Sequence, residues 1–138
     1  MENYPGKTRQ IGKYIFNDCN ICINPERQDF WINKYWYARL RWCDCGNGWF
    51  TYSFDLSYGD GGHSFGCNYA DDNAKEGDWR RGYKSKKVCL LKCCDDVINE
   101  FEHIYEHNNV NAKRLVKMIT DYKKSLHEPK VVQLELFN

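Results

Sequence analysis

The sequence predicts an α+β fold, an antiparallel β-meander of three to five strands followed by two helices packed on one face of the sheet. Most aromatic residues fall before Tyr83, in alternating segments separated by glycine-rich stretches. After Lys86, apolar residues recur at three- and four-residue steps, as in amphipathic helices. A chain of 138 residues with this arrangement predicts one domain over 1–127, followed by a tail over 128–138.

Two alternating segments, 34–42 and 49–57, predict a β-hairpin whose turn contains Gly46, Asn47 and Gly48. In the first segment, an apolar face alternates with a face of tyrosine and arginine, made of Tyr35, Tyr37, Arg39 and Arg41. Further strands are expected at 12–16, 30–33 and 64–69. The glycine-rich stretch 58–66 is interpreted as a flexible turn.

Two helices are expected at 86–107 and 112–126. Ser85 is placed to cap the first, and Asn111 to cap the second. Pro129 prevents the second helix from continuing.

Composition narrows the class of protein. The net charge is +1, so no strong global field indicates a nucleic-acid binder. The first residues lack a signal-peptide core, and no apolar run is long enough to span a membrane. We therefore expect a cytoplasmic protein whose eight cysteines are thiols or metal ligands. Export of the protein would instead allow four disulfides.

Four of the cysteines form two pairs with spacing that suggests zinc. Cys19 and Cys22 form a C-x2-C knuckle, and Cys43 and Cys45 follow about twenty residues later at the predicted hairpin turn. Two such pairs could supply four tetrahedral ligands, although the second pair departs from C-x2-C spacing. The alternative is that all four are half-buried thiols. The remaining helical cysteines, Cys89, Cys93 and Cys94, are expected to fill the core.

The segment from His103 to His107 resembles the H-x-x-E-H string of inverted zinc metallopeptidases. That family needs a third protein ligand downstream, and the only glutamates left, Glu128 and Glu135, lie in the tail. We interpret the string as an exposed last helical turn, and we expect no enzymatic activity.

A basic stretch precedes and enters the first helix. Its cations include Arg80, Arg81, Lys84, Lys86 and Lys87, with no acid between them. Cations beside a helix N-terminus suit a phosphate or an acidic partner surface. The alternative is a set of solvated charges that pair with acids nearby.

The chain ends in Gln133-Leu134-Glu135-Leu136-Phe137-Asn138. Residues 133–137 resemble the bacterial β sliding clamp-binding motif, whose usual form is Gln-Leu-(Ser/Asp)-Leu-Phe. The resemblance implies that Gln133 docks in a small polar site and that Leu136 and Phe137 fill an apolar pocket, supported by Leu134. The alternative is a terminal β-strand over 130–137.

These features lead to three hypotheses. The first is a non-enzymatic accessory protein, resembling those of phages and mobile elements, recruited to the clamp and contacting DNA or a host protein. The second is an inhibitor that binds a host defence or nucleic-acid enzyme. The third is a zinc-stabilised interaction domain.

Overall fold

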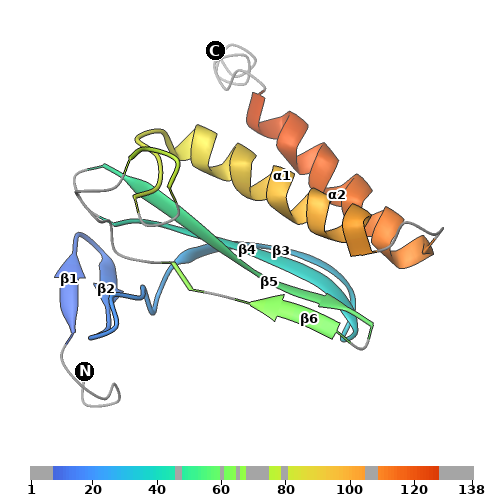
Figure 1. Cartoon of the computed structure of the whole chain (residues 1–138), viewed down its shortest axis with the longest axis horizontal. Coiled ribbons are helices and arrows are strands. Elements are labelled where there is room, and N and C mark those ends of the chain that lie inside the picture. Colours follow the sequence, from blue (N-terminus) through green and yellow to red (C-terminus); the bar gives the residue numbers. More distant parts are fainter. Residues whose placement is uncertain are drawn as a thin grey trace, which may run out of the picture.

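The computed structural model confirms the α+β fold. Figure 1 shows a large sheet with two helices lying across one of its faces and a small two-stranded sheet at one end. The residues that the structure describes are 8–45, 48–59, 61–64, 66–67, 75–78, 81–104 and 109–127.

The large sheet is the predicted antiparallel meander, with strand order β3-β4-β5-β6. Its strands are β3 (Glu26–Asn33), β4 (Trp36–Asp44), β5 (Phe50–Tyr58) and β6 (Gly61–Ser64). The small sheet pairs β1 (Arg9–Ile11) with β2 (Tyr14–Phe16). The predicted β4–β5 hairpin is present, with Leu40 opposite Phe54.

Three strand predictions need correction. The segment predicted as one strand, 12–16, turns at Gly12 (φ 59°) and forms the hairpin β1–β2. The strand predicted at 30–33 begins earlier, at Glu26, because Glu26 and Gln28, on the same face as the buried Phe30, are polar and conceal the alternation. The expected turn at 58–66 contains β6, which ends at Ser64, where the sequence predicts the start of a strand.

Glycine allows β6 to pair inside a stretch that reads as a turn. A β-carbon on Gly62 would lie 2.8 Å from the Leu56 carbonyl oxygen, closer than real side chains come. The backbone of β6 can therefore approach β5 only because Gly62 has no side chain.

The helices are α1 (Lys86–Ile104) and α2 (Val110–His127). Ser85 caps α1 as predicted, because its Oγ accepts the Val88 N–H at 3.2 Å. The cap of α2 is Asn109 rather than Asn111: its Oδ1 accepts the Ala112 N–H at 3.0 Å. A cap two residues earlier starts α2 at Val110 instead of residue 112.

The main core lies between the sheet and the helices. Apolar residues of β4 and β5 pack there against helix residues that include Val97, Phe101, Leu115 and Ile119. A second buried cluster lies on the opposite face, where the β1–β2 sheet covers one end of the large sheet. It contains Tyr14, Phe16, Cys22, Cys43, Cys45 and Cys67. The helices do not cover the rest of this opposite face.

Buried tyrosines make the stability of this core sensitive to alkaline pH. Burial raises the pKa of Tyr122, which packs on the main core, from 10.0 to about 12. The folded protein therefore holds this proton more tightly than the unfolded chain, so the stabilising term is complete below pH 10 and lost between pH 10 and 12. Burial raises the pKa of Tyr14 in the same way. The pKa of Tyr52 is raised further still, first by burial and then by the hydrogen bond that the Tyr52 hydroxyl donates to Asp96.

We expect the urea midpoint to fall as the pH rises above 10, the ordinary tyrosine pKa. Tyr122→Phe removes one titrating group and should lose less stability than the parent protein over the same pH interval. Urea titrations at several pH values test this, and parallel pH profiles for the two proteins would show that Tyr122 makes no such contribution.

Candidate functional site

The segment before α1 is fixed against the edge of the large sheet. Phe50 and Tyr83 exchange two backbone hydrogen bonds, of 2.6 and 2.8 Å. Lys84, which lies between Tyr83 and the start of α1, donates its backbone N–H to Glu76 Oε2 at 3.0 Å. Gly82 (φ 82°) allows the tight approach, because its backbone passes directly beside the Phe50 carbonyl. The basic side chains of this segment are thus carried on an anchored backbone.

Three cations of this segment lie over indole rings. The Arg81 guanidinium lies 3.8 Å from the centroid of the Trp49 ring, and Lys84 Nζ lies 5.3 Å from the same centroid. Lys86 Nζ lies 5.9 Å from the centroid of the Trp42 ring. Cation–π contacts of this kind hold long basic side chains near one position. We call Trp42, Trp49, Arg81, Lys84 and Lys86 the basic platform.

The structure brings together most of the predicted anion-binding residues. Arg81 and Lys84 share the Trp49 ring, Lys86 lies over the separate Trp42 ring, and Lys87 follows on the exposed first turn of α1. Arg80 lies outside the described residues. The first turn of α1 contains no acidic residue, so its N–H groups and positive end of the dipole add to these charges. This arrangement suits an anionic group.

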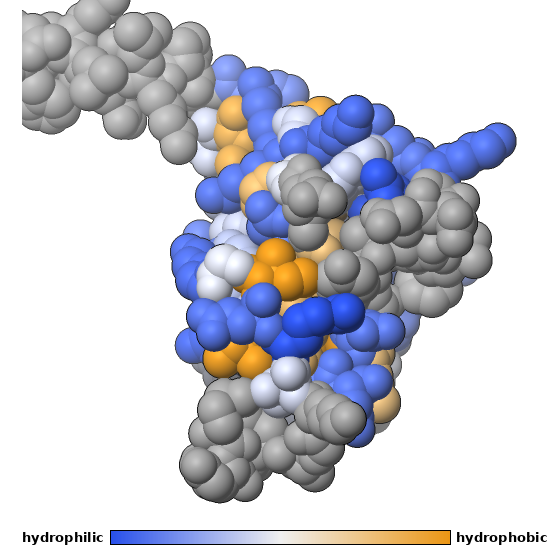
Figure 2. Space-filling view, turned by 90° about the vertical axis from the view of Figure 1, so that its left-hand side faces the viewer, coloured by the Kyte–Doolittle hydropathy of each residue, from blue (hydrophilic) through white to orange (hydrophobic). Residues whose placement is uncertain are grey.

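Figure 2 views the end of the molecule that carries β1, β2 and the segment before α1. Hydrophilic residues cover much of the described surface and surround a small hydrophobic area.

Three buried thiols form a row beneath the β1–β2 sheet. Cys43 of β4 lies between Cys22 and Cys67, and its hydrogen bonds to them, with burial, raise its pKa far above the usual range. The same contacts lower the pKa of Cys22 and Cys67. The Cys67 sulfur lies 3.2 Å from Ser53 Oγ, which in turn accepts the Arg41 Nε–H at 3.1 Å. The row therefore ends at a guanidinium on the open side of the sheet.

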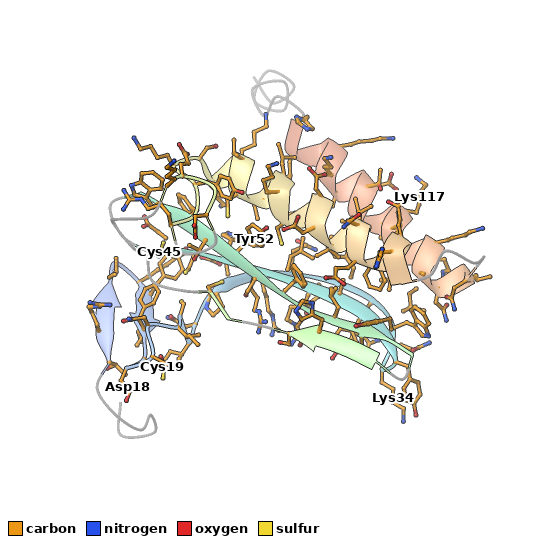
Figure 3. The ribbon with its side chains drawn as sticks, viewed as in Figure 1. Asp18, Cys19, Lys34, Cys45, Tyr52 and Lys117 are labelled. Atoms are coloured by element: carbon orange, nitrogen blue, oxygen red, sulfur yellow. The ribbon has the colours of Figure 1, made fainter. Side chains whose placement is uncertain are left out.

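The four predicted zinc ligands are not gathered into one group. Cys22, Cys43 and Cys45 are buried together, but Cys19 is exposed, and Figure 3 shows it well apart from Cys45. The Cys45 sulfur instead donates to the Trp49 carbonyl at 3.1 Å. Over the described part of the chain, no three His, Cys, Asp or Glu side chains are arranged to hold a metal ion. Zinc binding stays a prediction, which metal analysis of the purified protein can test.

All eight cysteines, each within the described residues, are free thiols, and only Cys19 is exposed. We therefore expect a thiol reagent to modify one residue in the native protein and eight after denaturation, as counted by mass spectrometry. Cys19→Ser should abolish the native adduct. Rapid native modification of a second cysteine would show that the buried thiol row opens in solution.

Two contributors to these sites are not identifiable from the sequence patterns. Trp49 belongs to an alternating strand segment, and its pairing with Arg81 depends on a segment more than thirty residues away. Cys67 falls within a segment with a strand pattern, although its burial beside Cys43 makes it the third member of the thiol row. That pattern gives no indication that Cys67 lies beside Cys43.

Other predicted sites fall partly or wholly outside the described residues. His103 is exposed near the end of α1, whereas residues 105–108 and the clamp-type residues Gln133, Leu134, Leu136 and Phe137 are not described. The core role of Cys89, Cys93 and Cys94 is confirmed, and burial raises the pKa of each.

Neither described helix combines the length and apolar character needed to cross a bilayer. Scans against protein-family models, curated proteins and solved structures find no match for the chain.

Proposed function

We propose that the chain is a non-enzymatic accessory protein that contacts DNA through the basic platform and is recruited to a bacterial sliding clamp by its C-terminal motif. The observation that supports DNA contact is the stacking of Arg81 and Lys84 on Trp49, beside Lys86 and the N-terminus of α1. Cations held over aromatic rings provide both phosphate contacts and apolar surface. The backbone that carries them is anchored to β5, so little ordering is needed on binding.

Salt-dependent binding to a short duplex tests the platform. Each phosphate contact adds about 0.9 to the slope of log affinity against log salt, so Lys84→Ala/Lys86→Ala should lower the slope by about 2. Fluorescence anisotropy between about 50 and 200 mM salt measures this change.

The matched control is Lys117→Ala/Lys124→Ala, which removes the same charge from exposed positions on α2. It should leave the slope close to that of the parent protein. Equal slopes for the two double variants would contradict a local DNA site. A saturable protein partner without DNA binding would favour the inhibitor hypothesis instead.

The clamp proposal rests on the resemblance of residues 133–137 to the clamp-binding motif. Calorimetric titration of a bacterial β clamp with the full chain should give an affinity of roughly micromolar strength. Leu136→Ala/Phe137→Ala should abolish the heat of binding, whereas Val131→Ala/Val132→Ala should retain it. If Val131→Ala/Val132→Ala instead loses stability and Leu136→Ala/Phe137→Ala binds the clamp normally, the tail is a packed strand.

A further inference from the structure

The face of the large sheet opposite the helices carries an ordered grid of side chains. Cross-strand pairing places three rows along β3, β4 and β5: Trp31–Tyr37–Ser57, Asp29–Arg39–Asp55 and Arg27–Arg41–Ser53. The β1–β2 sheet covers the end of this face next to the third row, where Cys43 is buried. The grid thus runs from an aromatic row to an arginine row at the border of the second core.

The aromatic row presents a stacked pair of rings. The ring centroids of Trp31 and Tyr37 are 5.0 Å apart with an interplanar angle of 12°, and Trp31 is 54% exposed. An exposed indole supported by a second ring offers a rigid surface for an unpaired base.

The arginine row borders a cavity of about 550 Å³. Three arginines and one glutamate line it, together with Asn24 and Ser53: Arg27, Arg39, Arg41 and Glu26. Arg41 is oriented by two hydroxyls, since Nε donates to Ser53 Oγ at 3.1 Å and Nη2 to Ser64 Oγ at 3.3 Å. A guanidinium held in this way has the fork geometry that matches phosphate oxygens.

The middle row favours a single strand over a duplex. Asp29 accepts a hydrogen bond from Arg39 Nε at 2.9 Å, and Asp55 lies 4.0 Å from Arg39 Nη1, so two carboxylates flank the Arg39 guanidinium. Asp29 Oδ2 also lies 3.8 Å from Arg27 Nε. This row would repel a phosphate placed directly over it, so a bound strand has to cross it with bases rather than with phosphates. The same carboxylates can accept hydrogen bonds from the exocyclic amino groups of unpaired bases.

The spacing of the rows also fits a short strand. Tyr37 and Arg41 are four residues apart on β4, which corresponds to about 13 Å along the strand. Sheet faces with stacking aromatics elsewhere take about two or three bases.

We infer that this open face binds single-stranded nucleic acid, with a base stacked on Trp31 and a phosphate held in the cavity by Arg27 and Arg41. The inference rests on the proposed association with nucleic acid but uses a different surface from the basic platform. The platform contacts duplex phosphates, and the open face takes an unpaired segment.

The test compares binding of a labelled single strand, a duplex and a mononucleotide to the full chain. Trp31→Ala and Arg27→Gln should each weaken single-strand binding about tenfold or more, because each removes a stacking or phosphate contact. Arg114→Gln, at an exposed position of α2 on the other side of the sheet, should leave it unchanged. Circular dichroism confirms the fold of each variant.

Unchanged single-strand affinity in both Trp31→Ala and Arg27→Gln, or no single-strand binding at all, would overturn the inference. Duplex binding through Lys84 and Lys86 would still support the proposed function in that case. Single-strand binding that depends on Trp31 but not on Lys84 and Lys86 supports the inference. A lack of duplex binding alongside it would contradict only the platform. A mononucleotide that binds as tightly as the strand would overturn recognition of a strand.

Discussion

Replacing Gly82 by alanine is expected to destabilise the protein by about 3 kcal/mol and to release the basic platform from the sheet. The positive φ of 82° costs an alanine about 1–2 kcal/mol. The new β-carbon would also overlap the Phe50 carbonyl oxygen, so the two Phe50–Tyr83 hydrogen bonds must break. Loss of these bonds adds about 1–3 kcal/mol. Urea unfolding measures the change.

Gly48→Ala separates the two causes. Gly48 also has a positive φ (79°), but a β-carbon added there would have no atom within 4 Å. This variant should lose only the conformational term of about 1–2 kcal/mol. Equal losses for the two variants would mean that the segment before α1 is not held against Phe50. Under the proposed function, duplex affinity should fall in Gly82→Ala and be retained in Gly48→Ala.

The elements that could be predicted from the sequence are those with a strong local period. Trp36, Ala38, Leu40 and Trp42 alternate cleanly because one face of β4 is buried under the helices. Ser85 directly precedes the apolar helix pattern, so its capping role can be predicted from its position. Elements without a period escape such prediction: β6 consists of exposed residues, two of them glycines, and only pairing with β5 defines it.

The candidate sites are harder to predict, because they depend on contacts between residues far apart in the chain. Local charge density identifies Arg81 and Lys84, but the ring beneath both, Trp49, comes from a distant segment. The tyrosine and arginine face of β4 can be read from its alternation, whereas the alignment of Arg41 with Arg27 depends on the β3 register. Short cysteine spacings pair Cys19 with Cys22, yet the fold places Cys67 near Cys22 and beside Cys43 instead.

Truncating Phe101 is expected to be the most destabilising single substitution in the main core that we consider. Phe101 is 1% exposed, lies near the end of α1 and contacts the Tyr58 ring edge-on, with centroids 6.4 Å apart. Phe101→Ala leaves a cavity between the helix and the sheet and should cost about 3–5 kcal/mol. Val110→Ala, at a 69% exposed position of α2, should change stability by less than about 0.5 kcal/mol.

Phe101→Ala also tests whether the stability of the fold and the binding of DNA are separate properties. Residues 86 and 101 lie about 22 Å apart along α1, so the basic platform and the Phe101 contact occupy opposite ends of the helix. Under conditions where Phe101→Ala remains folded, duplex affinity should equal that of the parent protein, although the urea midpoint falls. A loss below about 1 kcal/mol would show that α1 does not pack on the sheet through Phe101. A loss of affinity in the folded variant would show that the platform depends on the packing of the whole helix.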